Sequence, residues 1–168
     1  MKISAIIEQL REYLPPLVGQ PWGDRVAGAA DLQAVQDKAR MVIPALYVVL
    51  SEDVARVDQG HFHELITERF SIFAVLKNDD RRGQRPQDLV QDLRTGIFKA
   101  ILNWQPDSFA GPVEYVGGQY IAMDGARYFH RFDFQRRMEI DESDGFLKDY
   151  DDFKQLFVDW QVEEIITP

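Results

Sequence analysis

The hydrophobic pattern predicts two amphipathic helices. In residues 3–14 the apolar positions recur every three or four residues, and the two prolines at positions 15 and 16 must end that helix. A second helix should begin near Pro86, because proline suits the first helical turn. Its apolar stripe consists of Leu89, Leu93, Ile97, Ala100, Ile101 and Trp104. Each helix therefore has one face that must be buried against another element.

Two stretches between these helices have the pattern of β-strands. Residues 45–50 are continuously apolar and predict a buried strand, which a polar loop over residues 51–60 should end. Residues 65–77 predict a longer strand in which apolar side chains alternate between the two faces. Residues 17–28 are expected to be a turn-rich connector, and residues 31–40 a weak helix.

Residues 112–137 predict a three-stranded β-meander. Its apolar and aromatic runs cover residues 113–116, 119–123 and 128–134. Gly117-Gly118 and Asp124-Gly125 separate these runs, and both dipeptides favour tight turns. Gly117-Gly118 lacks the glycine spacing of a phosphate-binding loop and precedes a strand, so a turn is favoured over a ligand site.

The negative charge of the chain is concentrated at its C-terminal end. Of the net charge of −9, residues 141–168 contribute −7, from nine acidic residues and two lysines. We therefore expect a core over residues 1–140, followed by an acidic C-terminal extension over residues 141–168. The extension should contain a short amphipathic helix with the apolar residues Tyr150, Phe153, Leu156, Phe157 and Trp160. That stripe either covers its own domain or docks on a neighbouring subunit.

The composition argues against several classes of protein. The chain has no cysteine, which excludes disulfides, thiolate nucleophiles and cysteine-based zinc sites. It has no basic stripe, so tight nucleic-acid binding is not expected. The longest apolar run, residues 41–50, is about half as long as a membrane-spanning helix requires. With no signal peptide expected at the N-terminus, the predicted environment is a reducing cytoplasm.

Candidate catalytic chemistry is sparse. His61 and His63 would lie on the same side of an extended segment and could begin a metal site with Glu64 or Asp58, but a third ligand is hard to supply. His130 lies on the aromatic face of its predicted strand, which favours a core or interface histidine. No Gly-x-Ser-x-Gly nucleophile motif is present. The sequence therefore predicts no enzyme and no cofactor.

Candidate partner-binding residues lie in three places. The charged segment at residues 78–85 is either a solvated loop or a surface whose charges steer a partner protein. On the second helix, Phe98 and Leu102 lie outside the buried stripe and could face a partner outside the domain. The third place is the C-terminal stripe. The candidates are Asp79, Asp80, Arg81, Arg82, Arg85, Phe98, Leu102, Phe153, Leu156, Phe157 and Trp160.

The order and spacing of several segments resemble the tail terminator proteins of long-tailed bacteriophages, particularly those of Mu-like phages and related prophages. Beside the N-terminal helix, the matching segments are RVAGAADL at residues 25–32, PALYV at 44–48, the strand at 70–77, LNWQP at 102–106, EYVGG at 114–118 and the last strand with Phe134. Together they cover about residues 1–140. Residues 141–168 match no motif of the family.

The resemblance implies an α+β subunit with a mostly antiparallel mixed sheet, two main helices packed on one face, and the C-terminal extension. It implies a homo-hexameric ring that caps the tail tube, ends its polymerisation and offers a surface to head-completion or neck proteins. DNA would pass through this ring without specific binding. The protein would lie at the head-proximal end of the tail in the virion, and in the host cytoplasm during assembly.

Two alternatives remain open. The protein could be a head–tail connector or a minor tail protein of the same region of the virion. A remote alternative is a metal-dependent enzyme that uses His61 and His63.

Overall fold

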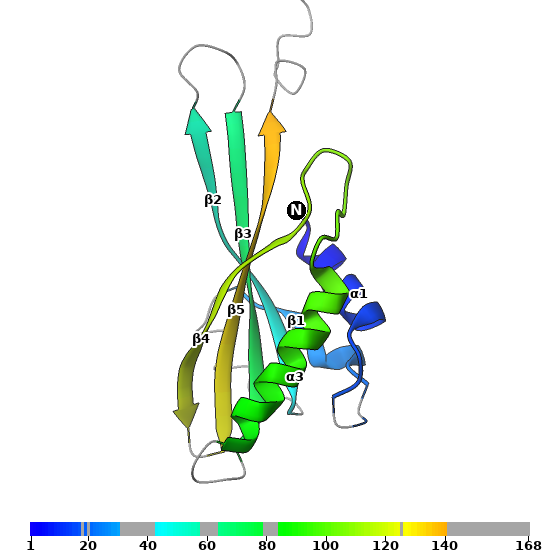
Figure 1. The fold of residues 1–168 in the computed structure, drawn as a ribbon, viewed down its shortest axis with the longest axis vertical. Coiled ribbons are helices and arrows are strands. Elements are labelled where there is room, and N and C mark those ends of the chain that lie inside the picture. The colour runs from blue at the N-terminus through cyan, green and yellow to red at the C-terminus, as the bar shows by residue number, and fades with distance from the viewer. Residues whose placement is uncertain are drawn as a thin grey trace, which may run out of the picture.

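The computed structural model describes residues 1–17, 19, 21–30, 43–57, 64–78, 84–124 and 126–140. The elements in chain order are α1 (Ile3–Tyr13), the 3₁₀ helix η1 (Gly23–Arg25), β1 (Val26–Gly28), β2 (Ala45–Val57), β3 (Glu64–Lys77), α3 (Gln84–Ile101), β4 (Glu114–Asp124) and β5 (Arg127–Ile140). The strands form one sheet in the order β1-β2-β3-β5-β4. Among the strand pairs of the described residues, only β1–β2 is parallel. The predicted α+β class with a mostly antiparallel sheet is confirmed (Figure 1).

Both helices pack on the same face of the sheet (Figure 1). Ile6 and Leu10 of α1 and Ile97 of α3 are fully buried against sheet residues that include Phe132 and Phe134. Burial of each such side chain contributes about 1.5–3 kcal/mol. The two helices predicted from the apolar spacing are therefore confirmed, with α1 ending at Tyr13 just before the two prolines.

The opposite face of the sheet carries a smaller buried cluster. Its members are Ala29, Ala45, Tyr47, Val49, Phe73, Val75 and Phe129. The alternation predicted for residues 65–77 explains why β3 contributes to both clusters. Its even-numbered residues from 70 to 76 face the helices, whereas Phe73 and Val75 face the other way.

The polar loop predicted over residues 51–60 is wrong for its first part, because β2 continues to Val57. A β-bulge between Leu50 and Glu52 shifts the register, and pairing with β3 then continues to Glu64. Pairing with β3 satisfies the backbone of these polar residues, and Glu52 forms an ion pair with Arg69 across the two strands at 2.7 Å. Residues 52–57, 64–69 and 135–140 form a three-stranded arm that extends beyond the helices (Figure 1).

The connector predicted over residues 17–28 contains one strand that the sequence pattern did not reveal. β1 pairs in parallel with β2, with Ala27 opposite Tyr47. A strand of three residues is too short to show a period of two, so only its pairing with β2 identifies it. The weak helix predicted over residues 31–40 lies outside the described residues.

The predicted three-stranded meander is wrong, because β4 runs without a turn through Gly117 and Gly118. Two strands, β4 and β5, take the place of the predicted three. A Cβ atom at Gly118 would lie 2.8 Å from the Tyr115 hydroxyl and 3.1 Å from the Arg131 carbonyl oxygen. Gly118 is thus explained by a close packing contact within a strand and not by a turn. The turn predicted at Asp124 is confirmed, since β4 ends there and β5 begins at Arg127.

Candidate interaction surfaces

The segment between α3 and β4, residues 102–113, is closed at its base by backbone hydrogen bonds. The Asn103 amide donates to the Val113 carbonyl at 3.0 Å, and the Val113 amide donates to the Trp104 carbonyl at 2.9 Å. Asn103 has a φ of 61°, a left-handed conformation that asparagine tolerates better than most residues. We call this segment the 102–113 loop. Its backbone leaves the helix and returns to the sheet along a defined path.

A buried arginine joins the 102–113 loop to the three-stranded arm. Arg136 on β5 is 3% exposed; its Nε contacts the Glu68 carboxylate, and its Nη1 donates to Asp107 Oδ2 at 2.7 Å. The amine of Met1 also contacts Glu68. The hydrogen bond from Arg136 lowers the pKa of Asp107. Burial alone would raise the pKa of Glu68, but hydrogen bonds from the Met1 amine and Arg136 outweigh it and lower that pKa.

Phe109 lies on the 102–113 loop and is 79% exposed. The backbone on its C-terminal side is bound to the rest of the domain. Gln105 Nε2 donates to the Ala110 carbonyl at 2.8 Å, and the Gly111 amide donates to the Arg137 carbonyl at 2.7 Å. On the N-terminal side, Asp107 Oδ2 accepts the hydrogen bond from Arg136 Nη1 at 2.7 Å. The loop thus presents an aromatic side chain to solvent from a fixed backbone.

A second surface is an apolar groove of about 430 Å³ between the end of α1 and the middle of α3. The groove is lined by Leu14, Pro15, Pro16, Leu17, Leu89, Asp92, Leu93, Thr95, Gly96 and Lys99. A Cβ atom at Gly96 would lie 2.9 Å from Leu14 Cδ1, so this glycine permits the close approach of α3 to the chain after α1. We call this feature the α1–α3 groove.

A third hollow, of about 330 Å³, lies on the sheet face opposite the helices. Its polar side chains bind one another. Ser71 Oγ lies 3.1 Å from Ser51 Oγ and donates to Asp133 Oδ1 at 2.6 Å. Arg131 forms an ion pair with Asp133 at 2.9 Å. Among the residues that the structure describes, no three His, Cys, Asp or Glu side chains are grouped as a metal site requires.

His130 on β5 is a buried core residue, 7% exposed. Its ring centroid lies 4.7 Å from that of Phe132. Within the described part of the chain neither ring nitrogen has a hydrogen-bond partner. Burial, followed by the nearby charge of Arg94, lowers its pKa below the ordinary value of 6.5. The ring is therefore neutral at pH 7.

The structure describes only three of the eleven partner-binding candidates. Arg85 lies exposed at the start of α3. Phe98 is partly buried and packs edge-on against Tyr115 of β4, with ring centroids 4.7 Å apart. Leu102 is 37% exposed. Their role in binding a partner stays a prediction.

The remaining candidates lie outside the described residues, as do His61 and His63 of the metal alternative. These candidates are Asp79, Asp80, Arg81, Arg82, Phe153, Leu156, Phe157 and Trp160.

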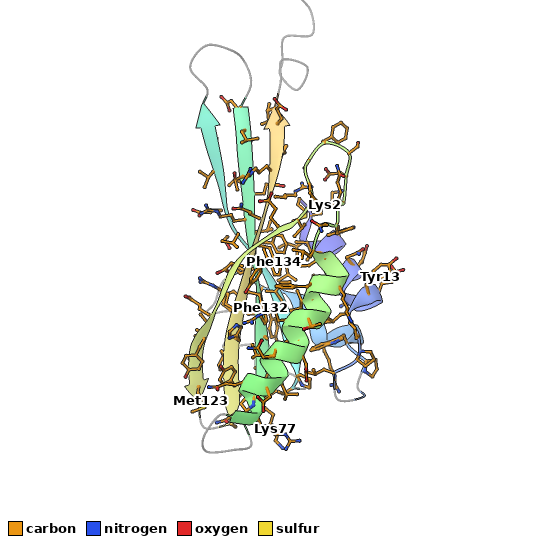
Figure 2. The ribbon with its side chains drawn as sticks, viewed as in Figure 1. Lys2, Tyr13, Lys77, Met123, Phe132 and Phe134 are labelled. Carbon is orange, nitrogen blue, oxygen red and sulfur yellow. The ribbon has the colours of Figure 1, made fainter. Side chains whose placement is uncertain are left out.

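Sequence reasoning missed Phe109 and the α1–α3 groove. The signal for Phe109 was its position in a short segment with Pro106, Gly111 and Pro112, because residues of this kind form loops and loops run over the protein surface. The groove had no such signal, because residues 14–17 and α3 are far apart in the chain and meet only in the fold (Figure 2).

Comparison with known proteins gives one family. The family model described as phage tail terminator protein matches residues 1–144. No curated protein matches the chain. Among solved structures, a chain from the virion of a native gene transfer agent particle superimposes with a TM-score of 0.50 at 13% sequence identity, over 82% of this chain and 93% of that chain. At that identity the likeness shows the fold alone. In the described part of the chain no helix is long and apolar enough to span a membrane.

Proposed function

Because the chain belongs to the phage tail terminator family and is therefore a structural protein of a phage tail, we propose that it forms a ring at the head-proximal end of the tail tube. The ring has six subunits, ends tube polymerisation and offers a surface to head-completion or neck proteins. The observation that carries this proposal is the family match over residues 1–144. The shared fold with a virion protein supports it.

The surface of the subunit is consistent with assembly. Large apolar side chains are exposed on the edge strand β4, on the three-stranded arm and on the 102–113 loop. They include Val116, Tyr120, Leu65 and Phe109, each at least 40% exposed. Edge strands and exposed apolar side chains are common parts of protein interfaces. The net charge of −9 suits a ring through which DNA passes, since an acidic wall repels phosphates instead of binding them.

The proposal is tested with the purified full-length chain and the tail tube protein. Native mass spectrometry and electron microscopy should detect a six-subunit ring, and the ring should bind the ends of tubes and limit their length. A chain that stays monomeric and does not associate with tubes would contradict the proposal.

The connector and minor-tail alternatives predict a different result in the virion. Phage particles that lack a terminator should produce abnormally long tubes, because nothing stops polymerisation. Tails of normal length without this protein would instead place it at an adjacent connector or minor-tail position. Elemental analysis of the purified protein addresses the metal alternative, which requires a stoichiometric metal ion at His61 and His63.

A further inference from the structure

Phe109 has the features of an interface anchor. At 79% it is the most exposed large apolar side chain in the described part of the chain. The loop backbone on either side of it is nevertheless held in place, because Arg136 Nη1 donates to Asp107 Oδ2 at 2.7 Å and the Gly111 amide donates to the Arg137 carbonyl at 2.7 Å. A fixed loop loses little conformational freedom when its aromatic side chain binds a partner. Aromatic side chains that a partner buries on binding supply much of the binding energy of many protein interfaces.

The α1–α3 groove has the size and lining that such an anchor requires. Its volume of about 430 Å³ falls within the range of pockets that enclose small ligands, roughly 300–1,000 Å³, so a phenyl ring fits. Leucine and proline side chains supply most of the wall, and Thr95 lies at its exposed rim.

Anchor and groove lie on the same chain but do not meet within one subunit. The 102–113 loop extends beyond the C-terminal end of α3, whereas the groove lies beside the preceding turns of that helix (Figure 1). A contact between them therefore requires a second copy. Because the two surfaces differ, the contact is head-to-tail, and repeated contacts of this type close into a ring when the rotation permits.

The charges beside the two surfaces are complementary. Asp92 and Lys99 line the groove, and neither has an ion-pair partner among the described residues. Asp107, two residues before Phe109, is 37% exposed at its side chain. In a head-to-tail contact Lys99 can approach Asp107, and this pair of opposite charges would fix the orientation of the two subunits.

We propose that Phe109 of one subunit occupies the α1–α3 groove of the next subunit. This inference rests on the proposed ring and names the contact that closes it. The occupant of the groove is therefore a second copy of this chain.

Two variants separate the anchor from the groove. Phe109→Ser removes the anchor, and Thr95→Arg places a long charged side chain over the groove. Because Phe109 and Thr95 are exposed, both variants should keep the thermal midpoint of the wild type. Each variant alone should lose the ring, with subunit association weakened about 30-fold or more, the effect expected for an interface hot spot.

The decisive measurement mixes the two variants. The Phe109→Ser subunit retains an intact groove and the Thr95→Arg subunit retains an intact anchor, so the mixture can form one contact only. Native mass spectrometry should detect heterodimers and no larger species. Absence of the heterodimer would overturn the inference, and so would a ring formed by Phe109→Ser alone. As a control, Leu50→Ser removes another exposed apolar side chain, 45% exposed on β2, and should leave the ring intact.

Cross-linking gives a second measurement that keeps Phe109 in place. The chain has no cysteine, so Ser108→Cys and Thr95→Cys introduce the only thiols. With a short bismaleimide, the double variant should produce a ladder of covalent oligomers that ends at the size of the ring, and a denaturing gel detects it. Absence of the ladder would contradict the inference. A wild-type ring with no ladder would refute this contact alone, whereas a monomeric wild type would also refute the proposed ring.

Discussion

Arg136 is the most deeply buried charged residue in the described part of the chain. It lies between the carboxylates of Glu68 and Asp107 and so connects two strands of the arm with the 102–113 loop. A buried guanidinium is tolerated only where its hydrogen bonds compensate for its lost hydration, and two carboxylates provide that here. At the residue scale, this side chain fixes the loop that carries Phe109.

Arg136→Met should reduce the free energy of unfolding by about 2–3 kcal/mol. Removing one partner from a fully buried ion pair costs about 3–5 kcal/mol, and the partial exposure of Asp107 reduces that cost. Urea denaturation at pH 7 measures the difference. Arg137→Met is the matched control: its side chain is 55% exposed, so the expected change is below about 0.5 kcal/mol. Equal effects of both variants would contradict this account.

The same network predicts a pH dependence. Glu68 and Asp107 have a pKa lowered from the ordinary values of 4.5 and 3.8. Their contribution to stability is therefore present above these values and is lost as the pH falls below them. The difference between wild type and Arg136→Met should accordingly shrink in acid. Denaturation series between pH 7 and pH 3 test this, and a constant difference would argue against the network.

His130 predicts a separate dependence at higher pH. Its pKa is lowered from 6.5 in the folded state, chiefly by burial, so below about pH 6.5 the unfolded chain binds a proton that the folded chain does not. Stability should therefore decrease as the pH falls from 6.5 towards the folded pKa, by at most about 1.4 kcal/mol per pH unit. His130→Phe should flatten this part of the stability curve. Parallel curves for the two proteins would show that His130 does not titrate in this way.

At the scale of elements, β4 combines an exposed edge with close packing at one glycine. Its two bulges, at Tyr115/Gly117 and at Tyr120/Ala122, distort the strand without ending it. Bulges of this kind are common in edge strands and make regular pairing with another edge less favourable.

Gly118→Ala should destabilise the protein by about 1–2 kcal/mol. The added Cβ would collide with the Tyr115 hydroxyl and approach the Arg131 carbonyl oxygen, so the strand must shift. Gly117→Ala is the control, because a Cβ there has no atom within 4 Å and should change the stability by less than about 0.5 kcal/mol. Thermal unfolding of both variants distinguishes the strand from the turn that the sequence favoured. A turn that required both glycines would be disturbed by either change.

The contact between α3 and β4 gives another prediction at this scale. Phe98→Ala should cost about 2–3 kcal/mol, less than the ~3–5 kcal/mol of a fully buried phenylalanine, because Phe98 packs on Tyr115 but is only partly buried. Leu102→Ala, at a side chain 37% exposed, should cost less than about 1 kcal/mol. A Phe98→Ala variant of unchanged stability that fails to assemble would show instead that Phe98 binds a partner.

At the scale of the whole molecule, the main cluster joins α1, α3 and four strands of the sheet. The family match ends at residue 144. The predicted division at residue 140 lies close to that limit and remains a proposal.

Deleting residues 146–168 should leave a folded core and weaken assembly. The thermal midpoint is expected to change little, because the deletion leaves all of the segment that matches the family, residues 1–144. Native mass spectrometry should detect fewer complete rings if the stripe around Phe153 and Trp160 binds a neighbouring subunit or a neck protein. Loss of all cooperative unfolding would mean that the extension belongs to its own domain.

The sequence by itself determined the elements whose evidence is local. Helix α1, helix α3 and the two-sided burial of β3 follow from periods of 3.6 and 2 residues. The order of segments also indicated the family that the match confirms.

Only the tertiary structure decided the rest. The extension of β2, the strand β1 and the continuity of β4 through Gly118 depend on hydrogen bonds to strands that are distant in the chain, and local preferences oppose or do not detect them. Phe109 and the α1–α3 groove likewise depend on the fold. The sequence places Phe109 in a loop, but only the fold fixes that loop through the bond from Arg136 to Asp107 and brings residues 14–17 against α3 to form the groove. Contacts between distant residues create both surfaces, and such contacts have no local period by which a sequence reveals them.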